Sequence, residues 1–150
     1  MSSTNEIRKQ LHLEAPPARV WRAITDADEF GAWFRVKLET PFVVGQASSG
    51  HITYPGWEHL RFTLVTEAIE PPTRFAYRWH PYAVDTARDY SAEPMTLVEF
   101  LLEPRDGGTL VTVVESGFDR LPPERIDEAF RMNERGWAEQ LANIRSHVGG

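Results

Sequence analysis

Residues 14–26 read EAPPARVWRAITD. The two adjacent prolines end any strand that precedes them, because proline cannot donate to a β-ladder. They also suit the first turn of a helix, where a fixed φ and a missing N–H are harmless. Val20, Trp21 and Ile24 then follow at the spacing of a buried helical stripe. We therefore expect a short helix here, directly after a strand.

The segments on either side extend this pattern. Before it, Ile7, Leu11 and Leu13 share one side of an extended segment, and the other side is polar, which predicts a half-buried strand. After it, Thr25-Asp26 can cap a second short helix. This second helix carries three aromatic residues, Phe30, Trp33 and Phe34.

Extended segments dominate the middle of the chain. Short strands with tight turns are expected over 37–54, and further strands over 60–69, 74–79, 95–103 and 109–116. The last two are joined by a hairpin turn at 105–108. A polar loop with two tyrosines is expected over residues 80–94. It is longer than the usual ~4–6 residues, and loops of that length are often functional.

A long final helix opens at Leu121-Pro122-Pro123-Glu124. Its apolar residues recur at spacings of three, four or seven and form one stripe: Ile126, Phe130, Trp137, Leu141, Ile144 and Val148. Asn133 and Gln140 lie within the arc of this stripe and Gly136 lies beside it, so the stripe departs from a pure core pattern. The charged residues are expected on the outer, solvated face: Arg125, Glu128, Arg131, Glu134 and Arg135.

Length and composition limit the classes of function. A chain of 150 residues predicts one domain spanning residues 1–150. A net charge of -6 without a basic run argues against nucleic acid and anionic membranes as partners. The chain has no cysteine, no histidine pair at helical metal spacing and no phosphate-binding glycine loop. We therefore expect neither a metal nor a cofactor.

The sequence also bears on the cellular location of the protein. No apolar run approaches the ~18 residues that a membrane span requires. The N-terminal residues lack the basic and apolar regions of a signal peptide. We expect a cytoplasmic protein that does not insert into membranes.

Several motifs together resemble a known superfamily. The segment 14–26, followed by Trp33-Phe34, resembles the opening of the START-like (SRPBCC) superfamily, and is most similar to the branch of the activator of the heat shock protein 90 ATPase. Further matches to this branch are Glu70-Pro71-Pro72 before an aromatic strand, Gly107-Gly108-Thr109 leading into Glu115-Ser116-Gly117-Phe118, and Gly136-Trp137 with Leu141. The resemblance runs from Ile7 to Val148.

This resemblance implies an α+β helix-grip fold. A curved antiparallel sheet would surround the long C-terminal helix, with two short helices after the first strand and a ligand cavity between sheet and helix. The superfamily includes lipid carriers, hormone receptors, aromatic polyketide cyclases, oxygenase domains and co-chaperone domains, so the fold does not choose the chemistry. The chain has no room for a separate N-terminal chaperone-binding domain, and we do not expect a chaperone partner.

Glu115 is the most informative charged residue. Alternation along 109–116 places it with Val111 and Val113 on the face toward the helix, where burial would raise its pKa. It could then serve as a general acid or base, or hold a polar group of a ligand. The competing interpretation is a strand-end residue that reaches water or pairs with an arginine.

The aromatic residues of the sheet and the last helix are expected to converge on the cavity. For each one, an ordinary place in an aromatic core is the competing explanation. His80 could shuttle protons at the cavity mouth or be a solvated strand-end residue. The candidate ligand-binding residues are Trp33, Phe62, Tyr77, Trp79, His80, Phe100, Glu115, Phe118, Phe130 and Trp137.

Three hypotheses follow for function. The first, which we favour, is binding or non-covalent handling of a small hydrophobic molecule, aromatic or lipid-like, in the cavity. The second is an enzyme of the cyclase, isomerase or hydrolase type with Glu115 as acid or base. The third is a co-chaperone-like protein-binding domain with a filled core. The sequence leaves a homodimer open and does not name the ligand.

Overall fold

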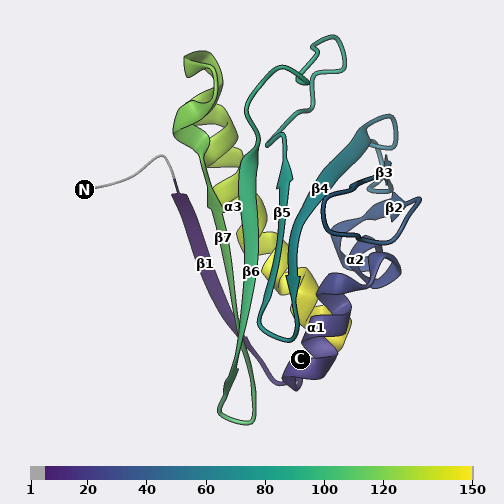
Figure 1. Ribbon diagram of the computed structural model, residues 1–150, viewed down its shortest axis with the longest axis vertical. Coiled ribbons are helices and arrows are strands. Elements are labelled where there is room, and N and C mark those ends of the chain that lie inside the picture. Colours follow the sequence, from purple (N-terminus) through teal and green to yellow (C-terminus); the bar gives the residue numbers. More distant parts are fainter. Residues whose placement is uncertain (1–5, 150) are drawn as a thin grey trace.

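One antiparallel sheet and one long helix make up most of the fold (Figure 1). The structure, a computed structural model, describes residues 6–149. Its elements follow the chain in the order β1 (Glu6–Leu13), α1 (Pro17–Thr25), α2 (Ala27–Phe34), β2 (Val36–Leu38), β3 (Ala47–Ile52), β4 (Arg61–Glu70), β5 (Arg74–Trp79), β6 (Thr96–Arg105), β7 (Gly108–Ser116), a 3₁₀ turn η1 (Phe118–Arg120) and α3 (Pro123–Val148). Residues 1–5, on which most of the expectation about a signal peptide rests, lie outside the described residues, as does Gly150.

The sheet has seven strands in the order β1-β7-β6-β5-β4-β3-β2, and every neighbouring pair is antiparallel. After β1, the chain passes through α1 and α2 to the opposite edge, and it then returns strand by strand to lie beside β1. Figure 1 shows α3 crossing one face of the sheet, from the end of β7 toward α1 and α2. This arrangement confirms the α+β helix-grip fold and the two short helices after the first strand.

Local sequence signals form the predicted helix starts and the predicted hairpin turn. Pro17 occupies the first turn of α1, and the Asp26 side chain caps α2 by accepting hydrogen bonds from the N–H groups of Asp28 and Glu29, both at 3.0 Å. In the β6–β7 hairpin, Asp106 and Gly107 have φ values of 51° and 79°. A two-residue turn with both φ values positive matches the right-handed twist of its strands.

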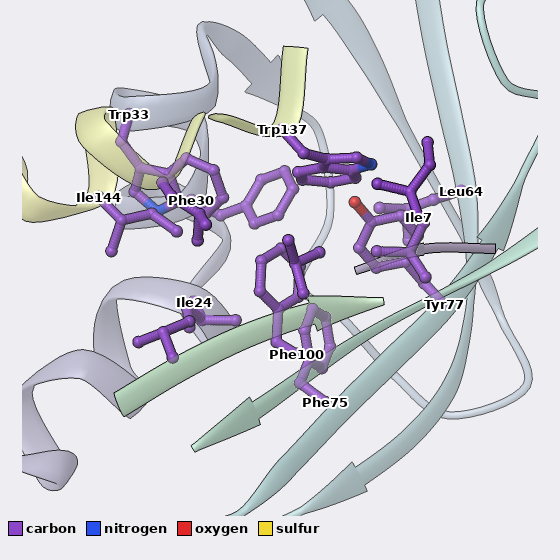
Figure 2. Packing of buried hydrophobic residues seen from close by; sticks show 14 of the residues in the cluster. Ile7, Ile24, Phe30, Trp33, Leu64, Phe75, Tyr77, Phe100, Trp137 and Ile144 are labelled. Carbon is purple, nitrogen blue, oxygen red and sulfur yellow. The ribbon is translucent and has the colours of Figure 1, made fainter. Parts of the chain in front are cut away.

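The core lies between the concave face of the sheet and the helices. Figure 2 shows Phe75, Tyr77 and Phe100 projecting from the sheet toward Phe30 of α2 and Trp137 of α3. All five side chains are buried. Because aromatic rings each bury a large area, this cluster supplies much of the hydrophobic stabilisation. One side of α3 stays outside the cluster and forms part of the candidate site.

Candidate functional site

Glu115 lies on the concave face of the sheet, as the alternation of β7 predicts. The register aligns it with Val98 of β6, with Tyr77 of β5 one strand further, and with Ile7 of β1 on the other side. Its side chain is completely buried, with an exposed fraction of 0%. The competing interpretation, a strand-end carboxylate that reaches water, is therefore wrong.

Four side chains donate hydrogen bonds to this carboxylate. Oε2 accepts from Thr96 Oγ1 at 2.5 Å and from Trp79 Nε1 at 2.7 Å. Oε1 accepts from Trp137 Nε1 at 2.8 Å and from Asn133 Nδ2 at 3.0 Å. A carboxylate offers about four acceptor positions, so these donors saturate it. Glu115 thereby ties together β5, β6, β7 and α3.

Burial and hydrogen bonding act on Glu115 in opposite directions. Burial raises the pKa of Glu115 above its ordinary value, because the charged form loses water, while the four donors favour that charged form. Burial also raises the pKa of Tyr77 well above its ordinary value, and the nearby charge of Glu115 adds to this effect. The Tyr77 phenol therefore remains protonated.

Two buried hydroxyls on the same face of the sheet have no hydrogen-bond partner among the described residues: Thr66 Oγ1 and the hydroxyl of Tyr77. They occupy adjacent strands in register, Thr66 on β4 and Tyr77 on β5. Figure 2 shows the Tyr77 hydroxyl directed toward the side of the core where the Trp137 indole lies.

A cleft of about 560 Å³ opens beside this buried group. Its walls come from the end of α2, from β3, β4 and β5, from the loop after β5 and from α3. The lining residues are Phe34, Ile52, Leu60, Arg61, Phe62, Thr63, Trp79, His80, Tyr82, Ala83, Val84, Asp89, Tyr90 and Asn133. Two of them, Trp79 and Asn133, donate hydrogen bonds to Glu115, which lies on their core side.

The cleft combines an aromatic floor with a polar rim. Phe34, Phe62 and Trp79 contact one another, with ring centroids 5.2–5.8 Å apart. Arg61 at the rim is paired with Glu39 through two hydrogen bonds of 2.8 and 2.9 Å, so its charge is already balanced. The Asp89 carboxylate also lines the cleft, so this arrangement suits a molecule with a flat apolar part and no negative charge.

A second, smaller groove of about 160 Å³ continues from the cleft along α3. The two spaces share Phe34, Trp79 and Asn133, and the groove adds Gly136, Trp137 and Gln140. Asn133 and Gly136 are the positions at which the apolar stripe of this helix departs from a core pattern. Those departures mark the side of α3 that lines the groove.

The loop between β5 and β6 forms the outer wall of the cleft and is fixed by Arg125. The guanidinium donates to Glu93 Oε1 at 3.0 Å and to the carbonyl oxygens of Pro81 and Tyr82 at 2.8 and 3.1 Å. It also lies 4.7 Å from the centre of the Tyr90 ring. The exposed fractions of the Arg125 and Glu93 side chains are 7% and 9%. The prediction that Arg125 lies on the outer face is therefore wrong, because it belongs to the same four-residue series as Ala129, Asn133 and Trp137.

The predicted site residues fall into two groups. Phe62, Trp79 and His80 line the cleft, Trp137 lines the groove, and Glu115 lies behind them. The others pack in the core: Trp33, Tyr77, Phe100 and Phe118 are buried, and the half-buried Phe130 meets Phe118 edge-on.

Several lining residues were not among the predicted set, namely Phe34, Tyr82, Tyr90, Asn133 and Gly136. The tyrosines of the long loop and the polar break in the helical stripe are the signals that point to them.

Residues 6–149 hold neither a metal-binding cluster nor a helix that could cross a membrane. No three or more histidine or acidic side chains gather there in a way that could hold a metal ion. No helix in that range has the length and apolar character needed to cross a membrane.

Comparison with known proteins identifies the fold and the family. A protein from the dynemicin biosynthetic locus superposes with a TM-score of 0.73 at 21% identity, over 97% of this chain and 47% of its own, so the chain spans about half of that protein's length. A protein from Arthrobacter aurescens gives 0.80 at 19%, over 99% and 90%. The Aha1 dimer from Colwellia psychrerythraea gives 0.70 at 17%, over 95% of each chain.

Among curated proteins, no match was found. The solved structures named above share too few residues with this chain to indicate more than its fold. At the level of sequence, the family described as Activator of Hsp90 ATPase homolog 1-like protein matches residues 14–149, which is most of the chain. The chain belongs to that family.

Proposed function

We propose that the protein binds a small, neutral and largely apolar molecule in the cleft beside Trp79. The proposal rests on two hydrogen bonds that the buried Glu115 side chain accepts, one from Trp79 and one from Asn133. Both donors line the cleft. Burying an unpaired charge is costly, and here the charge is instead fully hydrogen-bonded to side chains that border open space. Such a scaffold keeps the cleft preformed, which lowers the entropic cost of binding.

The lining chemistry supports an apolar ligand. Burying apolar surface contributes about 25 cal/mol per Å² before the costs of association. The rings of Phe34, Phe62 and Trp79 offer such surface, and Tyr82 and Tyr90 from the loop also line the cleft. A cleft of about 560 Å³ lies within the range of about 300–1,000 Å³ that is common for small-molecule sites.

The enzyme hypothesis receives less support. A general acid or base must come within hydrogen-bond reach of the proton that it moves. Glu115 lies behind Trp79 and Asn133, and its oxygens are already occupied by four donors. We therefore assign Glu115 a positioning role, with no direct contact to the ligand.

A pair of substitutions in one loop tests the proposal. Ala83 lines the cleft, whereas Ala87 is exposed on the same loop and does not. Titration with the neutral, fluorescent apolar dye N-phenyl-1-naphthylamine should show saturable binding to the wild type and to Ala87→Phe. Binding to Ala83→Phe should be at least tenfold weaker. Equal dye affinity of the two variants, or no saturable binding to the wild type, would contradict the proposal and favour a protein partner.

A further inference from the structure

Gly136 interrupts the middle of α3 although no neighbour requires a glycine there. In a helix interior, glycine costs about 1 kcal/mol relative to alanine. At Gly31, Gly50 and Gly108, backbone oxygens of adjacent segments occupy the space of a side chain, which explains those glycines. A Cβ at Gly136 would have no heavy atom of the adjacent segments within 4 Å. The glycine therefore preserves open space above the helix.

The open space is the groove of about 160 Å³, and three of its six lining residues are aromatic. Phe34 closes it on the α2 side, Trp79 on the sheet side and Trp137 along the helix. An apolar cavity of about 150 Å³ is known to hold one benzene molecule. The groove thus has the size and the lining for a single aromatic ring. Any side chain at position 136 would occupy part of that volume.

Asn133 provides a polar contact of fixed orientation beside this space. Asn133 turns its Nδ2 toward Glu115 Oε1, at 3.0 Å, and an ionised carboxylate only accepts hydrogen bonds, which favours this orientation. The amide oxygen, Oδ1, then faces away from Glu115. Because Asn133 lines both the groove and the cleft, Oδ1 is an acceptor at their junction.

We propose that the groove over Gly136 is a subsite for a planar aromatic ring carrying a hydroxyl group, whose hydrogen bond Asn133 Oδ1 accepts. This inference rests on the proposed function and narrows its ligand to phenol-like compounds. The ring lies in the groove, and the rest of the molecule extends into the larger cleft.

Two matched probes test the polar contact. 2-Naphthol carries the donor, and 2-methoxynaphthalene has the same ring system with the donor blocked. One hydrogen bond is worth about 0.5–1.5 kcal/mol, so the wild type should bind 2-naphthol about two- to tenfold more tightly in a tryptophan-fluorescence titration. Equal affinities, or a preference for the methoxy compound, would overturn the assignment of Asn133 as the acceptor.

Two matched leucine substitutions test the location. Gly136→Leu should weaken 2-naphthol binding at least tenfold, whereas Ala138→Leu, on the exposed side of the same helix, should leave it unchanged. Thermal unfolding should show both variants folded, because leucine favours a helix over glycine. The smaller Gly136→Ala variant provides a second test if the leucine disturbs packing, and its affinity should also fall.

The outcomes separate this inference from the proposed function. If Gly136→Leu binds 2-naphthol as the wild type does while Ala83→Phe does not, the ring lies elsewhere in the cleft and only the subsite is wrong. If the wild type binds neither 2-naphthol nor N-phenyl-1-naphthylamine, the proposed function and the subsite both fail.

Discussion

The indole N–H of Trp79 donates a 2.7 Å hydrogen bond to Oε2 of Glu115, and so joins a wall of the cleft to a carboxylate in the core. Trp137 makes the equivalent bond to the other carboxylate oxygen, Oε1, at 2.8 Å. The two indole rings lie 5.7 Å apart and are tilted by 30°. One buried charge therefore sets the orientation of two of the largest side chains around the proposed site.

Replacing Glu115 by Gln should destabilise the protein by about 2–4 kcal/mol. The new amide nitrogen would face two donors that previously shared one oxygen, and an indole N–H cannot reverse its role. Each buried donor left without a partner costs about 1–3 kcal/mol. Urea unfolding measures the loss. Glu103→Gln, at the exposed hairpin end, should stay within about 0.5 kcal/mol of the wild type. Similar stability of the two variants would contradict the account of Glu115.

Replacing Gly136 by Ala should stabilise the protein by about 0.5–1 kcal/mol. The position is helical, and the added methyl group meets no neighbouring atom. Differential scanning calorimetry should therefore show a higher Tm. A lower Tm would mean that the space above Gly136 is closed in solution, and the groove would then lose its physical basis.

Replacing Arg125 by Met should destabilise the protein by about 3 kcal/mol and loosen residues 81–93. Removing one member of a buried ion pair costs about 3–5 kcal/mol, and Glu93 keeps a second partner in Arg88, at 2.7 Å, which favours the lower end. In the Arg125→Met variant, the amide hydrogens of the loop should exchange faster than the amide hydrogens of β6. Arg131→Met, exposed on the same helix, serves as the control and should leave both properties unchanged.

Glu29 should make stability depend on pH in the acid range. Partial burial opposes its ionised form, but hydrogen bonds from His147, Arg19 and Arg22 outweigh this effect and lower the pKa of Glu29 from 4.5 to about 2. A lowered folded-state pKa stabilises the protein above the unfolded value, and this stabilisation is lost as the pH falls toward about 2. The difference in unfolding free energy between wild type and Glu29→Gln should shrink as the pH falls below 4.5. A difference independent of pH would contradict this.

Much of the fold could be predicted because its signals are local. Paired prolines stop a strand and start a helix, Asp106-Gly107 makes a two-residue turn, and alternation shows that Phe75 and Tyr77 share a face. Alternation also places Glu115 on the side facing the helix. Each of these inferences needs only residues close together in the sequence.

The site could be predicted only in part, because its contacts join distant segments. The donors to Glu115 come from positions 79, 96, 133 and 137, and no periodicity reveals that all four converge on one carboxylate. Arg125 was assigned to the solvated face because it is charged, although its spacing from Ala129 places it on the inner stripe. Its partners, Glu93 and two loop carbonyl groups, become apparent only when the loop is folded.

The most direct test of ligand binding at this cleft is a two-dimensional ¹H–¹⁵N NMR titration of the wild-type protein with 2-naphthol. The five tryptophan indoles provide built-in reporters. The account predicts shifts of the Trp79 and Trp137 indole signals, the Asn133 side-chain amide and the Gly136 backbone amide, with Trp21 and Trp57 unchanged. Shifts confined to Trp21 or Trp57, or no shifts at saturating probe, would contradict it.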